Sequence, residues 1–447
     1  MNKLLLTGTM VLALNAGAGE VRLITLDPGH FHAALVQKSM LPQVSPVVRV
    51  YSPGGPDLAA HLKLIDGFNT RPVDPTRWDE KVYTGPDFLE RMIREKAGNV
   101  VVISGNNAKK TRYIMDSVAA GLNVLSDKPM AITPADFVLL RQAFEQARRN
   151  GVLLYDIMTE RHEITTVLQR ELSRMPAVFG TLETGTPERP AITKESVHHY
   201  SKLVAGKPLI RPPWFFDVCQ QGEGIVDVTT HLVDLVQWEC FPDQVLDWQK
   251  DIHVLSARRW ETKITPAQFK QATKLEAYPD YLKLDRGTDN FLNVFGNGEF
   301  TYTLRGVCAK VSVTWNFEPP AGAGDTHYSL MRGTKATLVI KQGVEQHFKP
   351  ALYVENTSGA PAADFEAMLQ GAITTLNATY PGLAIQQAGA AWEIVIPDGY
   401  RNGHEAHFAQ VMQTYLRYLS DGKLPAWEAP NMIAKYYTTT KAYELSR

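Results

Sequence analysis

The sequence predicts an α/β protein in which a doubly wound parallel sheet precedes a second domain that is richer in β-strands. Three observations predict this class. Short, continuous apolar runs such as residues 100–103 are typical of strands buried on both faces of a parallel sheet. Helical patterns separate these runs through the first 155 residues, as crossover connections require. Further along, apolar and polar residues alternate through much of residues 293–341, which indicates half-buried strands.

The composition is that of a globular protein with two or three domains. The 447 residues include 46 basic and 47 acidic side chains, and 44% of all residues are hydrophobic. Because phosphate backbones are bound by an excess of Lys and Arg, we expect no nucleic-acid partner. The spacing of Cys219, Cys240 and Cys308 is not that of a zinc site, and we expect buried, unpaired cysteines.

The first nineteen residues differ from the rest of the chain. Lys3 precedes an apolar run, and the small residues Ala16 and Ala18 follow before Glu20. This order is typical of a secretory signal. We therefore expect residues 1–19 to be a signal peptide and the mature protein to be exported, to the periplasm; the alternative is a cytoplasmic protein. Since no later run is long enough to span a bilayer, we expect no membrane insertion after signal removal.

The first expected strand, residues 21–26, leads into a turn that could hold a dinucleotide. Of the pattern G-x-G-x-x-G only the middle glycine, Gly29, is present, while Asp27 and His32 occupy the outer positions. The middle glycine lets the backbone approach a pyrophosphate at a helix N-terminus. The two histidines of this turn are equally compatible with ordinary turn residues. The residues expected to contact the cofactor here are Gly29, His30, Phe31 and His32.

The second expected strand, residues 47–51, ends without the acidic residue that commonly binds a ribose. Ser52 and the glycines after it could leave room for a 2′-phosphate, or Asp57 could reach the ribose. The sequence leaves NAD and NADP open. Residues 66–80 contain Pro, Trp and polar side chains and predict a loop before a helix over 87–96.

The segment from Asn99 to Thr133 is the part around which the prediction is built. A buried strand over 100–103 is followed by the turn Ser104–Asn107, a helical pattern, a second strand over 123–125 and then Asp127-Lys128-Pro129. This arrangement places a lysine at the carboxyl edge of the sheet, where open α/β sheets bind ligands. Thr133 and Pro134 predict the cap and first residue of the next helix, which ends near residue 150 before a strand over 152–155.

The second domain begins with a helical stretch over 159–172, and Glu160 at its start follows the sheet edge closely enough to face substrate. A strand is expected over 178–184 and a loop over 185–213. From residue 223 a helix is expected in which Asp227 and His231, four residues apart, share one face.

Together these motifs resemble the Gfo/Idh/MocA oxidoreductases, NAD(P)-dependent enzymes that act mostly on sugars and cyclitols. Asp127-Lys128-Pro129 is similar to that family's Glu-Lys-Pro, and Gly222 to Asp234 is similar to its G-G-G-x-x-x-D-x-x-x-H-x-x-D motif. The resemblance implies a Rossmann-like dinucleotide-binding domain over 20–155. It also implies a substrate-binding and assembly domain of the α+β type over 156–447, with an open, largely antiparallel sheet and C-terminal helices. Residues 245–292 and 342–400 exceed the family pattern and receive no assignment.

The resemblance also implies roles for individual residues. Lys128 would bind the substrate hydroxyl and help to move its proton, His231 would be the general base, and Asp227 would orient His231 or hold a neighbouring hydroxyl. Further cofactor contacts are expected from Ser52, Ser104, Asn106, Asn107, Asp127, Lys128 and Pro129. Further substrate contacts are expected from Tyr155, Glu160, Trp214 and Phe216. No metal site is expected, because His404 and His407 lack a third ligand and the adjacent His198 and His199 point apart on a regular element.

The expected function is therefore nicotinamide-dependent oxidation or reduction of a secondary hydroxyl on a sugar, glycoside or cyclitol, by a homo-oligomer assembled through the C-terminal sheet. An exported enzyme would require a tightly bound NAD or NADP, because it cannot draw on the cytoplasmic pool. Two alternatives stay open. The first is a redox-neutral glycosidase that oxidises a ring carbon, eliminates the aglycone and reduces the ring again. The second is an exported sugar-binding protein without activity.

Overall fold

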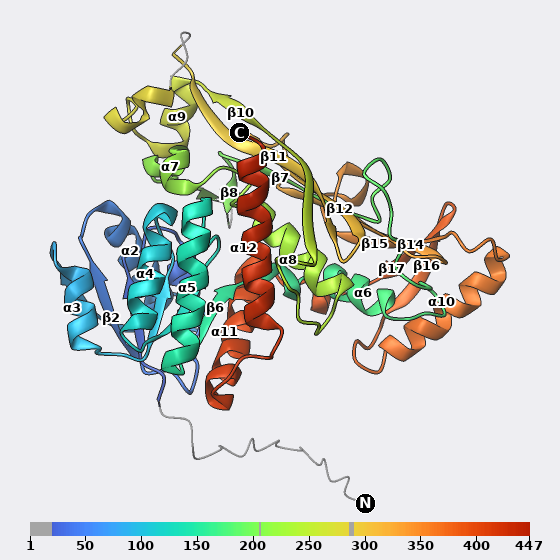
Figure 1. The fold of residues 1–447 in the computed structure, drawn as a ribbon, viewed down its shortest axis with the longest axis horizontal. Helices are drawn as coiled ribbons and strands as arrows, with labels where there is room; N and C mark the ends of the chain where they lie inside the picture. The colour runs from blue at the N-terminus through green and yellow to red at the C-terminus, as the bar shows by residue number, and fades with distance from the viewer. Residues whose placement is uncertain (1–19, 205–206, 286–289) are drawn as a thin grey trace, which may run out of the picture.

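The computed structural model describes residues 20–204, 207–285 and 290–447 (Figure 1). The predicted signal peptide lies outside these described residues. Within them, no helix combines the length and the apolar character that a membrane crossing needs.

The N-terminal domain is a parallel sheet with the strand order β3-β2-β1-β4-β5-β6, which confirms the predicted doubly wound fold. Its strands are β1 (Leu23–Leu26), β2 (Val47–Ser52), β3 (Asp79–Thr84), β4 (Val100–Ile103), β5 (Asn123–Asp127) and β6 (Leu154–Ile157). Its helices are α1 (His32–Leu35), α2 (Pro56–Thr70), α3 (Phe88–Glu95), α4 (Asn107–Ala119) and α5 (Pro134–Asn150). The order reverses between the neighbours β1 and β4, and a ligand crevice is expected beyond the carboxyl ends of these strands.

The prediction of a loop over 66–80 is wrong at both of its ends. The helix α2 continues to Thr70, and β3 begins at Asp79. The strand escaped prediction because it is the edge of the sheet and most of its side chains are exposed. Without a buried face, a strand carries no apolar run or alternation in its sequence.

The C-terminal domain is built on a larger sheet with the order β10-β11-β12-β7-β13-β14-β15-β17-β16, in which β12 and β7 are the parallel neighbours. The mostly antiparallel sheet confirms the expected α+β class. Its strands are β7 (Ile192–His199), β10 (Ile252–Ile264), β11 (Leu292–Leu304), β12 (Val307–Asn316), β13 (Thr326–Arg332), β14 (Ala336–Lys341), β15 (Ala351–Asn356), β16 (Ala384–Ala388) and β17 (Ala391–Val395). A separate small hairpin pairs β8 (Leu203–Val204) with β9 (Lys207–Pro208).

The helices of this domain fill the segments that the sequence left unassigned as well as those it predicted. They are α6 (Ile164–Ser173), α7 (Val218–Gln221), α8 (Thr229–Cys240), α9 (Pro266–Thr273), α10 (Ala362–Leu376), α11 (His404–Asp421) and α12 (Glu428–Leu445). Short 3-10 turns are η1 (Thr159–His162), η2 (Pro213–Phe216), η3 (Asp280–Asp285), η4 (Val344–Gln346) and η5 (Asp398–Tyr400).

Three expectations for this domain need correction. Residues 178–184 form turns rather than a strand, because Val178 and Phe179 are apolar residues that fill the core beneath the sheet. The strand β7 lies instead inside the predicted loop over 185–213. Lys194 interrupts the alternation of apolar and polar residues by which β7 could have been predicted. This side chain is fully buried because its ammonium group binds Glu239 at 2.8 Å. The helix expected from residue 223 begins at Thr229, so Asp227 precedes it.

The last helices return to the N-terminal domain. In Figure 1, α12 (red) runs between that domain and the C-terminal sheet, and it contacts α5, α8 and β10. Phe408, Tyr415, Met432 and Tyr436 from α11 and α12 belong to the same hydrophobic core as the parallel sheet. The C-terminal helices therefore pack against the N-terminal domain although they come last in the sequence. The domain boundary at residue 155 stays a prediction.

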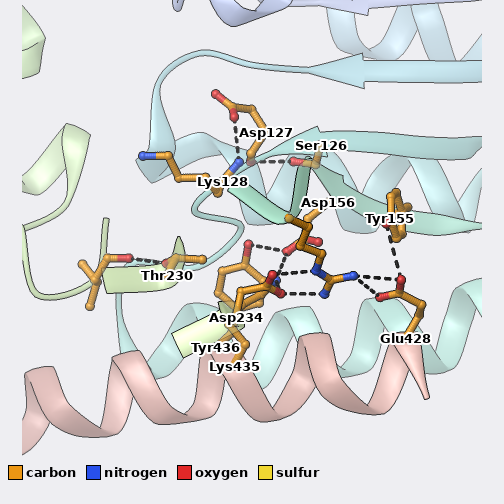
Figure 2. Close-up of polar contacts among 12 residues, drawn as sticks. Ser126, Asp127, Lys128, Tyr155, Asp156, Thr230, Asp234, Glu428, Lys435 and Tyr436 are labelled. Carbon is orange, nitrogen blue, oxygen red and sulfur yellow. Dashed lines mark hydrogen bonds and ion pairs between the residues drawn. The ribbon is translucent and has the colours of Figure 1, made fainter. Parts of the chain in front are cut away.

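A buried ion network joins α12 to both domains, and Figure 2 shows its members between the strands and the helix. Arg161 binds Asp234 through two contacts of 2.6 and 2.7 Å and reaches Glu428 at 2.9 Å. Lys435 binds Asp156 at 2.7 Å and Asp234 at 2.9 Å. Two cations thus face three carboxyl groups, and burial raises the pKa of Glu428.

The buried His61 of α2 is expected to make the stability of the N-terminal domain sensitive to acid. Its ring is 4% exposed, neither ring nitrogen has a hydrogen-bond partner within the described residues, and burial lowers its pKa from 6.5 to about 4. Between these pH values the unfolded chain binds a proton at His61 more readily than the folded chain does. The contribution of neutral His61 to the free energy of unfolding is therefore complete above pH 6.5 and is lost as the pH falls towards 4.

We expect His61→Leu to reduce the pH dependence of the free energy of unfolding in this window by up to about 3 kcal/mol. Denaturant titrations at the two ends of the window measure it, with the exposed His253→Gln as the control. An unchanged slope in His61→Leu would show that His61 does not titrate in this way.

Candidate active site

Two glycines, Gly29 and Gly105, lie in contact at the crevice where the strand order reverses between β1 and β4. A Cβ on Gly105, in the loop after β4, would lie 2.6 Å from the Asp27 carbonyl and 2.9 Å from the Gly29 nitrogen. A Cβ on Gly29 would crowd Asp57 and Trp214 at 3.2 and 3.3 Å. Both positions therefore favour glycine, which lets the two loops pack against each other at this edge of the sheet. The N–H groups of Gly29 and His30 donate to the Ser104 carbonyl and tie the two loops together.

His32 stands where a dinucleotide fingerprint has its last glycine, and its side chain is buried against Asp127. His32 Nδ1 lies 3.0 Å from Asp127 Oδ2, which also accepts a bond of 3.2 Å from the Ser104 hydroxyl. His30 Nδ1 lies 3.5 Å from the same oxygen. Burial alone would raise the pKa of Asp127, but the two histidines and Lys110 hold it well below its usual value. The carboxylate of Asp127 is therefore a fixed negative charge beside the crevice.

Lys128 and Asp227 come together although 99 residues separate them. Lys128 Nζ donates to Asp227 Oδ1 at 2.6 Å, and Gln221 Nε2 donates to the other carboxylate oxygen at 3.0 Å. Burial alone would raise the pKa of Asp227, but Lys128 and Gln221 lower it. The ammonium group is thereby fixed at the carboxyl end of β5, while its side chain points away from the ion network (Figure 2).

His231, in the first turn of α8, lies on the wall of the same cavity. Burial, with the Lys128 charge adding to it, lowers its pKa from 6.5 to about 4. His231 is therefore neutral near pH 7 and can accept a proton. Glu160 of η1 lies 3.7 Å from His404 Nδ1, and its charge favours the protonated form of His231. Burial alone would raise the pKa of Glu160, but His404 and His231 lower it strongly.

The cavity lies between the two domains and has a volume of about 1690 Å³. Its walls bring together His30, Phe31, His32, Asn107, Asp127, Lys128, Glu160, Asp227 and His231 from the predicted set. The opposite wall carries Asp325, which bonds His198 and His199 at 3.0 Å each and also Lys202. The prediction that the two adjacent histidines point apart is therefore wrong: Asp325, on the neighbouring loop, meets both rings.

The remaining predicted cofactor residues, apart from Asn107, lie beside the crevice without lining this cavity. Ser52 accepts a bond from the Gly54 N–H at 3.1 Å. Asn106 caps α4 and donates to Gln220 at 2.7 Å, and Asn107 donates to the Gln221 carbonyl at 2.7 Å. The asparagines thus hold α7 of the second domain against the first. Pro129 follows Lys128 through a cis peptide.

Three residues predicted to bind substrate do not line the cavity. The Tyr155 hydroxyl is buried 3.4 Å from Glu428, and its ring stacks on Tyr415. Phe216 packs in the core of the second domain. Trp214 donates to Asp57 at 2.8 Å behind Gly29. An aromatic run in sequence does not distinguish a sugar platform from core, and the structure gives these side chains packing roles.

Sequence reasoning missed residues that hold the site in place. Lys110 is buried, and its ammonium group donates to the carbonyls of Asp127 and Lys128 at 3.0 and 3.3 Å. Burial lowers its pKa to about 8. Gln221 holds Asp227, and His404 approaches Glu160. The sequence places Lys110 about one turn after Asn106 without showing that it is buried against Asp127 and Lys128, and nothing local indicates His404, which comes from α11.

A family model and solved structures match this chain. Residues 168–447 match the family model described as "Putative oxidoreductase C terminal domain". A structure described as a "putative oxidoreductase" from Parabacteroides merdae ATCC 43184 is 58% identical with a TM-score of 0.94, over 96% of this chain and 98% of that chain. No curated protein matches the chain.

Two distant structures show the same fold with ligands bound. A levoglucosan dehydrogenase in complex with NADH and levoglucosan is 13% identical with a TM-score of 0.59, over 96% of this chain and 97% of that one. A 3-ketoreductase from Actinomadura kijaniata in complex with TDP-benzene and NADP is 13% identical with a TM-score of 0.54, over 95% and 96%.

Proposed function

The chain belongs to the Gfo/Idh/MocA family of oxidoreductases, and from that premise we propose that it oxidises or reduces a secondary hydroxyl of a sugar, glycoside or cyclitol. NAD or NADP is the hydride partner. The observation that carries the proposal is the ion pair of Lys128 and Asp227 at the carboxyl end of β5. It faces a cavity that also reaches the loop of the glycine crevice. A cofactor and a polyol can therefore meet at one lysine.

The residues present fit a nicotinamide dinucleotide in part. Gly29 and Gly105 bring two loops into contact at the sheet edge where α/β folds with this strand order bind dinucleotides, and Gly105 lines the cavity, which supports the assignment. Asp57 lies beside Gly29 and accepts a hydrogen bond of 2.8 Å from Trp214. From this position its carboxylate would contact a ribose hydroxyl, which favours NAD, because a carboxylate repels a 2′-phosphate.

The chemistry of each residue follows from its surroundings. The hydride chemistry at the carbinol carbon would be supplied by a nicotinamide held beside the loops of Gly29 and Gly105. Lys128 donates a hydrogen bond to the hydroxyl oxygen and stabilises the negative charge that forms when the proton leaves. His231 is neutral and accepts that proton, and Glu160 stabilises the imidazolium that results. Asp227 fixes the Lys128 ammonium group.

A carbohydrate substrate is supported by the chemistry of the cavity wall and by the distant relatives. Levoglucosan is bound by one of them, and another is a ketoreductase. Carboxylates and histidines from both domains line the cavity, as hydroxyl-rich ligands require. Its volume also admits a glycoside larger than one ring. The redox-neutral glycosidase stays an alternative because it needs the same lysine and histidine.

Export, tight cofactor binding and assembly through the C-terminal sheet are further proposals. They are tested by N-terminal sequencing of the secreted chain, by mass spectrometry of any dinucleotide released on denaturation, and by light scattering of the purified protein. Release of one dinucleotide per chain would support the closed redox cycle. An empty protein would favour an exchanging cofactor.

We expect Asp227→Asn to lower kcat roughly 10²-fold, because the neutral amide no longer fixes the Lys128 ammonium group in line with the substrate. Steady-state kinetics on a panel of sugars and glycosides with NAD and NADP measure it. Asp247→Asn, at a partly exposed aspartate outside the cavity, is the control. A wild-type kcat in Asp227→Asn would remove Asp227 from the mechanism.

The same assay separates the alternatives. Net reduction of the dinucleotide with a keto sugar as product supports the dehydrogenase. Release of the aglycone without net change in the dinucleotide supports the glycosidase. Binding of sugar with neither product supports the binding protein.

A further inference from the structure

We propose that His30, His32 and Asp127 form a binding site for a divalent metal ion of the zinc class, with an open coordination position towards the cavity. Each residue offers one ligand atom, and these atoms all lie within 4.8 Å of one another. The sequence predicts no metal here, because Asp127 lies about a hundred residues after the histidines. The proposal rests on this geometry and does not require the proposed function.

The distances match those of a metal site. Zinc bonds nitrogen and oxygen ligands at about 2.0–2.1 Å, so two ligands of a tetrahedral ion are roughly 3.3 Å apart. His30 Nδ1 and His32 Nδ1 lie 3.5 and 3.0 Å from Asp127 Oδ2. All three ligand atoms lie within 4.8 Å of one another, so small side-chain shifts would bring them around one ion. On binding, the His32 proton moves from Nδ1 to Nε2.

One ring nitrogen of His30 is buried without a hydrogen bond in the described part of the chain, which a metal ion would explain. Its Nδ1 is buried and aimed at the Asp127 carboxylate, but it has no hydrogen-bond partner within the described residues. A buried nitrogen without a partner is costly, and a metal ion would satisfy it.

The surroundings also support a metal ion. The Ser104 hydroxyl and the Lys128 N–H donate to Asp127 and orient its carboxylate, as partners of metal ligands commonly do. The nearby cations are already engaged, since Lys128 pairs with Asp227 and Lys110 bonds two carbonyl groups. Asp127 thus keeps its negative charge for an ion.

Three protein ligands leave a fourth position free, as in catalytic zinc sites. All three side chains line the cavity, and the His30 side chain is 19% exposed, so an ion can enter from the cavity. Water or an oxygen of a bound ligand would complete the coordination. The site would therefore place a Lewis acid beside Lys128.

The test measures metal content and needs no activity. The full chain, purified without a histidine tag and stripped with a chelator, is titrated with Co²⁺ and Zn²⁺. Visible absorption of Co²⁺ reports tetrahedral coordination, and elemental analysis after dialysis gives the number of ions. We expect one ion per chain in the wild type and affinity at least about tenfold weaker in His30→Gln and Asp127→Asn.

The controls separate a metal site from a structural cluster. His198→Gln changes another cavity histidine bonded to an aspartate, where Lys202 already provides the cation, and is expected to retain the ion. The His30→Gln substitution removes a contact of 3.5 Å with Asp127 but leaves the His32 and Ser104 contacts of that carboxylate in place, so its unfolding midpoint should stay close to that of the wild type. The proposal is overturned if the wild type takes up no more Co²⁺ than His30→Gln, or if all three variants lose it equally.

Discussion

Replacing Lys128 with alanine is expected to lower kcat by roughly 10²–10⁴-fold, which is the range for a residue that moves or stabilises a proton in the transition state. The side chain is 13% exposed, and its ammonium group lies 2.6 Å from Asp227 on the cavity wall. No other ammonium group in the described part of the cavity has this pairing with Asp227. Steady-state and single-turnover kinetics with the sugar panel measure the loss.

A second variant separates catalysis from packing. Lys128→Ala leaves the buried Asp227 without its cation and can weaken the fold. Lys128→Arg keeps a positive charge beside Asp227, but its longer, planar guanidinium cannot place a donor where the compact ammonium group lies. We expect Lys128→Arg to fold like the wild type and to stay almost inactive. Wild-type activity in either variant would remove the central role of Lys128.

Lys435→Met is expected to lower the free energy of unfolding by about 3–5 kcal/mol, because it removes one partner of a buried ion network. Lys435 is fully buried and binds Asp156 and Asp234 at 2.7 and 2.9 Å. Methionine has a similar length but leaves Asp156 with Tyr436 as its remaining hydrogen-bond partner. Since α12 joins the two domains, both should unfold at lower denaturant. Circular dichroism and fluorescence measure the transition.

Lys441→Met provides the matched control in the same helix. Lys441 is half exposed and pairs with Glu444, so its loss should change stability by less than about 1 kcal/mol. Equal effects of the two substitutions would show that the buried network does not hold α12 in place.

The buried parts of the fold could be predicted from the sequence, and the exposed or charge-compensated parts could not. β4 is apolar on both faces, and β5 contains the buried apolar pair Val124 and Leu125, so these runs identify both strands locally. β3 is an exposed edge, and β7 contains Lys194, whose burial depends on Glu239 from another element. A strand of this kind becomes recognisable when its partners are known.

The same limit applies to the site. Lys128, Asp227 and His231 were predicted because each belongs to a local motif, and the structure brings them to one cavity. His404 and Asp325 were missed because they reach the cavity from distant loops and helices. The His30–His32–Asp127 cluster could not be predicted either, since a separation of about a hundred residues carries no local periodicity. Residues that meet through tertiary contacts need the fold.

The central claim is hydride transfer between a carbohydrate carbinol carbon and a nicotinamide held at Lys128, and isotope transfer tests it most directly. The purified protein is mixed with sugars and glycosides deuterated at single carbinol carbons, then quenched, and the dinucleotide is analysed by mass spectrometry. We predict one deuterium on the nicotinamide ring with the wild type and none with Lys128→Ala. Turnover of a sugar without deuterium in the nicotinamide, or failure to bind any dinucleotide, would contradict the claim.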